Sequence, residues 1–388
     1  MSRARPDLLP PTAVEIAIVG AGPAGCATAL ALAAKGVTDI ALFEAVPDRA
    51  FRIGESVPAA ALGLLERLGV RTRIAALQPL VSSGATSLWR RDVPGHNDGL
   101  LEPRGAGWHL DRAAFDGALR QEVRARDLRL FQGWRLQDVR RAAGGGFELA
   151  FDVDGRRATT TAAILVDATG VAARALRRLG IARNPVDALQ IRYAVLELAG
   201  SGSDISRTWL EPAPYGWWYA ARIPGDRLVA MLATDRDSLA ASGLDLRRHE
   251  GFRAALAATR LIGRGPAAGA GAVLRLDSCS APTAILSGVA GPGWLAVGDA
   301  AWSCDPLTAQ GITKALDDGI AAAEAVARRR RGDADALGSY QAQSFARFTA
   351  TLRLRAALYA SQGRWPAAPF WRRRRGETDH SPLSSRAA

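Results

Sequence analysis

The sequence predicts an α/β fold in which one domain is assembled from separated segments of the chain, an antiparallel-sheet domain is inserted into it, and the C-terminal region is helical. Two observations lead to this prediction. An apolar run of strand character at 14–19 is followed by glycines and an alanine-rich stretch of helical character, which is how an α/β domain begins. Two later apolar runs lead into Asp167 and Asp299, and a block at 185–235 with the alternation of antiparallel strands lies between them.

Composition indicates an ordinary folded protein with ample core. The 388 residues are 48% hydrophobic and 23% charged, and the net charge of +12 is almost all arginine, because Lys35 and Lys314 are the only lysines. Two arginine runs, 328–331 and 372–375, are candidate sites for nucleic acid or an acidic partner. Neither lies in a basic helix with interleaved aromatic residues. We therefore expect a solvated helix end and a solvated tail, and no nucleic-acid partner.

Cysteine usage and hydropathy give an expectation about location. Cys26, Cys279 and Cys304 are far apart and odd in number, which argues against a disulfide framework or a metal site and indicates a reducing compartment. The apolar stretch 13–34 contains Glu15 and a glycine motif, so we interpret it as a buried strand and helix rather than a targeting segment or membrane span. We expect a cytoplasmic protein with no membrane partner.

The glycine motif is a dinucleotide-binding fingerprint in its required setting. Gly20, Gly22 and Gly25 form G-x-G-x-x-G between strand and helix, and a second short strand, 39–43, delivers Glu44, 19 positions after the third glycine. The first glycine makes the tight turn, the second admits a pyrophosphate, and the third lets the helix pack on the strand. The helix N-terminus attracts phosphates, and Glu44 is placed to hold a ribose. Pro23 and Ala24 complete the predicted pyrophosphate site.

The pattern along the chain predicts a cofactor domain in three parts. The expected segments are 1–80, the first part of the cofactor domain with a loose leader at 1–12; 81–155, mixed elements bridging both domains; 156–180, the second part; 181–275, a substrate sheet domain; 276–330, the third part; and 331–388, a helical region with a charged tail. Helices are expected at 58–68, 113–126, 245–260 and 309–330, and strands at 189–198, 206–210, 217–222, 228–233 and 294–297.

Three motifs in this order resemble those of the flavin-containing aromatic hydroxylases and the related flavin-dependent halogenases. They are the fingerprint, Asp167-Ala168-Thr169-Gly170, and Gly298-Asp299-Ala300-Ala301 followed by Asp305-Pro306-Leu307 and Gly311-Ile312. The resemblance implies a Rossmann-like FAD-binding domain of the p-hydroxybenzoate hydroxylase type. It implies that Asp299 binds the flavin ribityl chain and that 306–312 lies along the isoalloxazine edge. Cofactor residues implied outside the fingerprint are Arg52, Gly54, Arg112, Asp167, Gly170, Gly298, Asp299, Pro306, Gln310, Gly311 and Ile312.

A closer resemblance rests on four segments, 51–58, 216–219, 305–312 and 369–373. Together they look like the LodB/GoxB-type maturation flavoproteins of tryptophylquinone enzymes. This implies hydroxylation of a tryptophan in a partner polypeptide by reduced FAD and O2. Since there is one dinucleotide fingerprint, and the glycine-rich run 263–271 lacks the strand-then-helix setting, NAD(P)H would bind transiently or a flavin reductase would supply electrons.

The halogenases fit less well than the hydroxylases. Those enzymes use a lysine well after the fingerprint, and here none lies between Lys35 and Lys314. Their motif also carries a glutamate where this chain has Thr308. Chlorination is therefore not expected.

The candidate catalytic residues are Glu55, Ser56, His109 and Trp218. Glu55 and Ser56 either lie beside the flavin or cap the helix at 58–68, and His109 is either a base or a hydrogen-bonded core residue. Neighbours on a strand point to opposite faces, so one of Trp217 and Trp218 is expected to face the flavin cavity.

The sequence leaves alternatives open both for the roles of Arg52 and Arg112 and for the activity of the protein. The arginines either bind FAD phosphates or ribityl oxygens, or form surface ion pairs. The first interpretation of the activity is a monooxygenase acting on protein-bound tryptophan. The second is a monooxygenase, reductase or halogenase-like enzyme acting on a free small molecule, and the third is an FAD-binding assembly factor without turnover.

Overall fold

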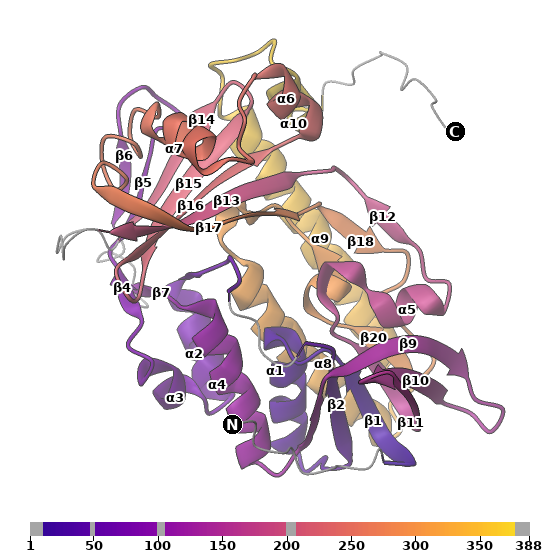
Figure 1. Ribbon diagram of the computed structural model, residues 1–388. Helices are drawn as coiled ribbons and strands as arrows, with labels where there is room; N and C mark the ends of the chain where they lie inside the picture. The colour runs from indigo at the N-terminus through magenta and orange to yellow at the C-terminus, as the bar shows by residue number, and fades with distance from the viewer. Residues whose placement is uncertain (1–10, 47–50, 99–104, 199–206, 377–388) are drawn as a thin grey trace. The chain divides into compact units, whose positions relative to one another are not determined.

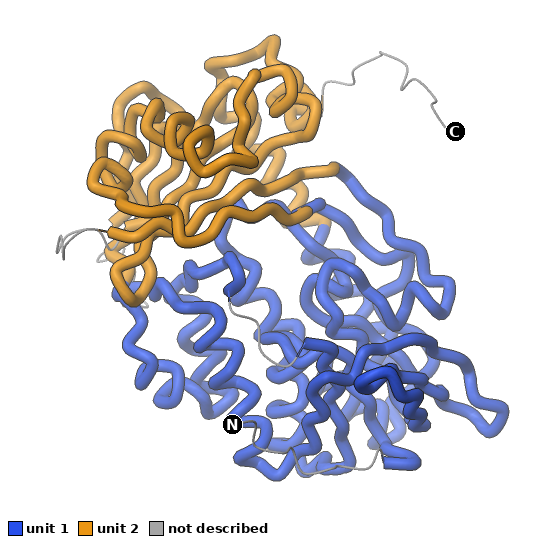
Figure 2. The backbone as a smooth tube through the Cα atoms, in the orientation of Figure 1, with its two compact units in different colours: residues 1–81, 102–187, 281–348 blue, residues 82–101, 188–280, 349–388 orange. Residues whose placement is uncertain are grey.

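A computed structural model describes residues 11–46, 51–98, 105–198 and 207–376 (Figure 1). Most of the predicted leader and the last part of the predicted tail lie outside them. The chain forms two compact units (Figure 2). Unit 1 comprises Met1–Val81, Glu102–Asp187 and Ala281–Phe348, and unit 2 comprises Ser82–Leu101, Ala188–Ser280 and Thr349–Ala388. Most of the segment 81–155, which was predicted to bridge both domains, therefore belongs to unit 1.

Unit 1 is built on an eight-stranded sheet with the order β19-β20-β11-β1-β2-β8, to which β10 and β9 are added through β11. Its strands are β1 (Ala13–Val19), β2 (Ile40–Glu44), β8 (Arg129–Gln132), β9 (Trp134–Arg141), β10 (Phe147–Val153), β11 (Arg156–Asp167), β19 (Ala290–Gly291) and β20 (Trp294–Ala296). Strand β1 pairs in parallel with both β2 and β11, and its last residue, Val19, lies opposite Phe43 and Asp167. The carboxyl ends of three parallel strands therefore meet at one edge, where ligands bind in open α/β sheets.

The helices of unit 1 follow from apolar spacing and capping. They are α1 (Pro23–Ala33), α2 (Ala59–Arg67), α3 (Arg71–Ala75), α4 (Arg112–Ala125), α5 (Arg174–Arg178), α8 (Gly311–Arg330) and the first half of α9 (Ala336–Ala360). Helix α1 is buried from Pro23 to Leu32, as its alanine-rich sequence requires. Helix α4 begins at a true cap, since Asp111 accepts hydrogen bonds from the Ala113 and Ala114 N–H groups at 2.8 and 3.0 Å.

Two small sheets complete the strand pairing of this part of the chain. One has the order β3-β7-β4 with strands Ser56–Val57, Gly107–His109 and Leu80–Ser82. The other has the order β12-β18-β21 with strands Arg183–Pro185, Ala284–Leu286 and Trp302–Ser303. The first brings two predicted catalytic residues together, because Ser56 pairs with His109.

Unit 2 is a seven-stranded sheet with the order β17-β13-β16-β15-β14-β5-β6. Its strands are β5 (Gly84–Ser87), β6 (Gly95–Asp98), β13 (Gln190–Leu198), β14 (Arg207–Ala213), β15 (Gly216–Ile223), β16 (Arg227–Thr234) and β17 (Ala270–Ser280). All neighbours are antiparallel except β14 and β5. The helices are α6 (Arg236–Ala241), α7 (His249–Ala257), the second half of α9 and α10 (Pro369–Arg374). The α/β fold class with an inserted antiparallel sheet and a helical C-terminal region is thus confirmed.

One predicted helix is shorter than its apolar pattern suggested. The expected helix at 245–260 is α7, which ends at Ala257. The buried Glu211 carboxylate on β14 accepts hydrogen bonds from the backbone N–H groups of Arg260, Leu261 and Ile262 at 2.6, 2.7 and 3.1 Å. Those N–H groups are therefore bonded to a side chain rather than to helix carbonyls, and the glycine-rich run after them folds as turns.

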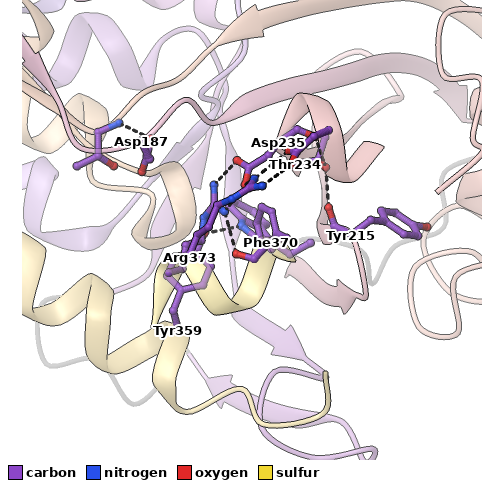
Figure 3. A network of polar contacts seen from close by, with 11 residues as sticks. Asp187, Tyr215, Thr234, Asp235, Tyr359, Phe370 and Arg373 are labelled. Carbon is purple, nitrogen blue, oxygen red and sulfur yellow. Dashed lines mark hydrogen bonds and ion pairs between the residues drawn. The ribbon is translucent and has the colours of Figure 1, made fainter. Parts of the chain in front are cut away.

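The two arginine runs have different fates. The run 328–331 forms the exposed end of α8, as predicted. The run 372–375 was wrongly expected to be a solvated tail. It forms the end of α10 and its C-cap, Arg375, in a helix where Phe370 and Trp371 are fully buried and Arg374 is 4% exposed. Asp235 binds this helix, as the close-up in Figure 3 shows.

No helix among the described ranges combines the length and apolar character that a membrane crossing requires.

Candidate functional site

The first two predicted motifs meet in unit 1. The Ala168 N–H group donates to the Val19 carbonyl at 2.8 Å. Gly20 has φ +108°, and a Cβ atom there would lie 2.3 Å from the Ala168 carbonyl oxygen. A Cβ atom on Gly25 would lie 1.9 Å from the Gly20 carbonyl oxygen. Neither separation is possible for a real Cβ atom, so both positions require glycine for the close approach that the fingerprint implies.

The third motif joins them through the sheet and through helix packing. The Val297 N–H group donates to the Asp167 carbonyl at 2.9 Å. Gly298 has φ +59°, and its Cβ atom would lie 2.7 Å from the Cβ of Ala24 on α1. A Cβ atom on Gly319 of α8 would lie equally close, 2.7 Å, to that of Ala27. Small residues thus let α1, α8 and the turn after β20 pack tightly, and the three sequence motifs converge.

The start of α1 has the features of an anion site. Its N-cap residue is Gly22, with no side-chain cap and no acidic residue in the first turn. A Cβ on Gly22 would meet only the Arg52 Nη1 atom, at 3.9 Å. Glu44 ends β2 and accepts the Ala21 N–H at 2.9 Å. The uncapped N-terminus of α1, with open space above it and the Arg52 guanidinium beside it, fits the diphosphate of a dinucleotide. The Glu44 carboxylate at the end of the next strand fits the ribose.

Arg112 and Arg52 share the carboxylate of Asp116. Arg112 is 9% exposed, its Nη2 lies 3.1 Å from Asp116 Oδ1, and its Nη1 donates to the carbonyls of Ile53 and Gly54 at 3.2 Å. The surface ion pair considered for Arg112 is therefore wrong, because this arginine is buried and braces the turn in which Gly54 has φ +99°. Arg52 lies 3.5 Å from Asp116, with 41% of its side chain exposed to solvent. Cofactor binding by Arg52, Gly54 and Arg112 stays a prediction.

Asp167 shapes its own turn. It is fully buried and accepts hydrogen bonds from the backbone N–H groups of Thr169 and Leu176, both at 2.9 Å, and from the Thr169 hydroxyl at 2.7 Å. Burial raises the pKa of this carboxyl group above its ordinary value. Gly170 follows with φ +73° and open space at its Cβ position. Asp167 therefore holds the loop that Gly20 packs against.

Three of the four predicted catalytic residues lie together in unit 1. Glu55 is 3% exposed and His109 is fully buried, with Ser56 opposite His109 in the β3–β7 pair. Glu55 accepts the Gly54 N–H group at 2.9 Å. The capping alternative for Glu55 and Ser56 is wrong, because α2 begins after Pro58 with no side-chain cap. Catalytic roles for these three residues stay predictions.

The tryptophan pair on β15 is part of the core of unit 2. Trp217 and Trp218 are both fully buried. Trp218 packs against Phe252 of α7 with ring centroids 5.5 Å apart, and the Trp217 indole N–H donates to the Tyr359 hydroxyl at 2.9 Å. The two side chains point to opposite faces of the strand, as expected, and other side chains cover both of them. The Trp218 indole lies inside an apolar cluster of unit 2, and a catalytic role for this residue stays a prediction.

The segment 298–312 forms the other side of the candidate site. Asp299 lies in a short turn, with 46% of its side chain exposed. Asp305 accepts the Leu307 N–H at 3.0 Å and so shapes the turn that begins at Pro306. Helix α8 follows, with Gln310 as an N-cap whose side chain makes no capping hydrogen bond and with Gly311 and Ile312 in its first turn. The predicted helix start is confirmed, and its N–H groups and dipole are available to an electron-rich group.

Sequence reasoning missed a group of charged residues behind this segment. Lys314, Asp318, Arg347 and the Trp302 ring surround the Gly298–Asp299 turn. Lys314 and Asp318 share one face of α8 at an i, i+4 spacing. That spacing was a signal in the sequence, and two buried charges on an otherwise apolar helix face could have been recognised from it.

Comparison with known proteins agrees with this geometry. Residues 13–254 match the protein family described as FAD binding domain. The protein named FAD-dependent oxidoreductase LodB, from Marinomonas mediterranea, is 26% identical over 373 residues, which cover 92% of this chain and 95% of that protein. Menaquinone reductase from Mycolicibacterium smegmatis is 28% identical over 335 residues, covering 81% of this chain and 76% of that protein.

Two solved structures are similar over nearly the whole chain. The flavin-dependent halogenase CmlS superposes with a TM-score of 0.82 at 23% identity, covering 94% of this chain and 68% of the other. QhpG, described as a peptidyl tryptophan dihydroxylase essential for tryptophylquinone cofactor biogenesis, superposes with a TM-score of 0.73 at 25% identity, covering 97% of this chain and 81% of the other.

Proposed function

The chain belongs to the FAD-binding domain family and is a flavin-dependent oxidoreductase, and from this premise we propose that it hydroxylates the indole ring of a tryptophan residue in a partner polypeptide during maturation of a quinone cofactor. Similarity over nearly the whole chain carries the proposal. Similarity to the tryptophan dihydroxylase QhpG extends over 97% of this chain, and similarity to LodB extends over 92% of it. The segments that resemble maturation flavoproteins thus belong to a likeness that spans both units.

The residues of unit 1 fit the FAD that this reaction requires. We place the diphosphate over Gly22, Pro23, Ala24 and Gly25 at the start of α1, with Arg52 beside it. In this placement Glu44 would hold the adenosine ribose, Asp299 would bind the ribityl chain, and Pro306 to Ile312 would contact the flavin ring. The N-terminus of α8 would favour negative charge on a bound flavin ring by about 0.3–1 kcal/mol.

Flavin supplies the redox chemistry of this reaction. One atom of O2 enters a ring C–H bond and the other leaves as water, with two electrons taken from reduced FAD. The electrons come originally from NAD(P)H or from a flavin reductase. The protein's own tasks are to orient the indole, exclude water and supply protons, and Glu55, Ser56 and His109 are the candidates for the last of these.

The test is a mass measurement on the substrate. The FAD-loaded protein is incubated with a reductant, O2 and the unprocessed, tryptophan-bearing polypeptide of a quinone-cofactor enzyme. We expect a gain of about 16 or 32 mass units on a tryptophan, for one or two oxygen atoms, and no gain on the same polypeptide with that tryptophan replaced by phenylalanine. An unmodified polypeptide in a reaction that consumes reductant and O2 contradicts the proposal.

A second candidate is an oxidoreductase that acts on a free small molecule. The match to menaquinone reductase over 81% of the chain favours it. Turnover of a free quinone or free aromatic compound, with the polypeptide left unmodified, would support this function instead. Bound FAD without turnover in either assay would leave a role in assembly.

A further inference from the structure

Lys314 is a buried cation beside the proposed flavin ligand Asp299. Its side chain is 3% exposed, and its Nζ atom lies 3.6 Å from Asp299 Oδ1 and 3.3 Å from Asp318 Oδ2. The same atom lies 4.3 Å from the centroid of the Trp302 ring. Burying an ammonium group is costly unless opposite charges accompany it. Two carboxylates and an aromatic face therefore stabilise the lysine where it lies.

The two carboxylates differ in what else they contact. Asp318 is 1% exposed and also accepts hydrogen bonds from the Gly298 N–H at 3.2 Å and from Arg347 Nη1 at 2.7 Å. Asp318 therefore keeps a cation and a backbone donor if Lys314 is removed. The Asp299 side chain is 46% exposed, and Lys314 is the cation with which it pairs among the described residues. Removing Lys314 thus changes the surroundings of Asp299 more than those of Asp318.

We propose that Lys314 is a positioning residue, whose ammonium group attracts one oxygen of Asp299 through an ion pair so that the other is presented to the ribityl hydroxyls of FAD. The inference rests on the proposed function only in taking Asp299 as an FAD ligand. A half-exposed aspartate samples several rotamers, and fixing it on binding costs affinity. An ion pair formed beforehand removes part of that cost, so the loss of Lys314 weakens FAD binding through Asp299.

The test is a double-mutant cycle on FAD affinity, measured by titrating flavin-free protein with FAD and no substrate. We expect Lys314→Met to raise the FAD dissociation constant about tenfold, and Asp299→Asn to raise it at least as much. In the Asp299→Asn background, Lys314→Met should have no further effect, because the residue through which it acts is already altered. An unchanged constant for Lys314→Met, or equal effects of Lys314→Met in both backgrounds, overturns the proposal.

Two further variants separate positioning from a purely structural role. Lys314→Arg keeps the charge and should bind FAD within about threefold of the original protein. Lys35→Met removes the chain's other lysine, which pairs with Glu324 at the surface, and should leave FAD affinity unchanged. If Lys314→Met does not fold, the cycle is run with Lys314→Gln, and the flavin-free melting temperature of each variant shows that the folds are comparable.

The outcome is independent of the reaction. If the protein does not hydroxylate tryptophan, the FAD titration still tests the role of Lys314. If the effects in the cycle are additive, the role of Lys314 is wrong but the proposed hydroxylase activity is not contradicted.

Discussion

Replacing Gly22 by aspartate is expected to lower FAD affinity at least about 100-fold and to leave the flavin-free protein folded. Gly22 is the N-cap of α1 in extended backbone conformation, and a Cβ atom there meets nothing closer than the Arg52 Nη1 atom at 3.9 Å. An aspartate therefore fits without strain. Its carboxylate would occupy the space proposed for the diphosphate, and like charges placed together cost several kcal/mol, where each 1.4 kcal/mol is a factor of ten in affinity.

The same substitution should stabilise the flavin-free protein slightly. Aspartate is a preferred N-cap, worth a few tenths of a kcal/mol over glycine, and Arg52 lies close enough to pair with it. The measurements are the FAD dissociation constant and the melting temperature of the flavin-free protein. We expect weaker FAD binding together with a higher melting temperature, which a general loss of structure cannot produce.

The matched control is Gly36→Asp, at the other end of the same helix. Gly36 has open space at its Cβ position but φ +77°, so aspartate is strained there and should lower the melting temperature without reaching the proposed diphosphate site. FAD affinity should be unchanged there. If Gly22→Asp retains the original FAD affinity, the diphosphate does not lie at the start of α1.

The parts of this site that the sequence predicted are those set by local spacing. Gly20, Gly22 and Gly25 lie within one strand–turn–helix, and the parallel pairing of β1 with β2 brings Glu44 to Ala21. An apolar run followed by such a turn leaves few other folds. The convergence of the second and third motifs was also predictable, because both follow strands whose carboxyl ends share an edge of the sheet.

The parts that the sequence did not predict depend on side chains that meet across long separations. The Glu211 carboxylate accepts hydrogen bonds from the backbone N–H groups of residues 260–262. No local sequence pattern predicts these hydrogen bonds. One of Trp217 and Trp218 was expected to lie in the core and the other to face the flavin cavity. Instead Trp218 packs against Phe252 of α7, and Trp217 donates a hydrogen bond to Tyr359. The two arginine runs look alike in sequence. Arg374 is buried because it pairs with Asp235, a residue distant in the sequence, and this pairing could not be predicted from the run itself.

Replacing Arg374 by methionine is therefore expected to destabilise the protein by about 3 kcal/mol. Arg374 binds Asp235 with two hydrogen bonds, Nη1 to Oδ2 at 2.8 Å and Nη2 to Oδ1 at 2.7 Å, and the two side chains are 2% and 10% exposed. Its guanidinium also lies 3.7 Å from the centroid of the Phe370 ring. Removing one partner of a buried pair costs about 3–5 kcal/mol, because the other charge stays buried. We expect a loss of stability near the lower end of this range, because Arg373 lies 3.1 Å from Asp235 and still pairs with it.

Urea unfolding followed by tryptophan fluorescence measures the loss. The control is Arg329→Met in the other arginine run, where the side chain is exposed and the change should stay within about 0.5 kcal/mol. The double variant Asp235→Leu with Arg374→Met should recover most of the stability, since an apolar pair of similar size often replaces a buried ion pair without loss. Equal stability of Arg374→Met and Arg329→Met would show that α10 is held by Phe370 and Trp371 alone, and a double variant no better than Arg374→Met would show that Asp235 is needed for more than this pair.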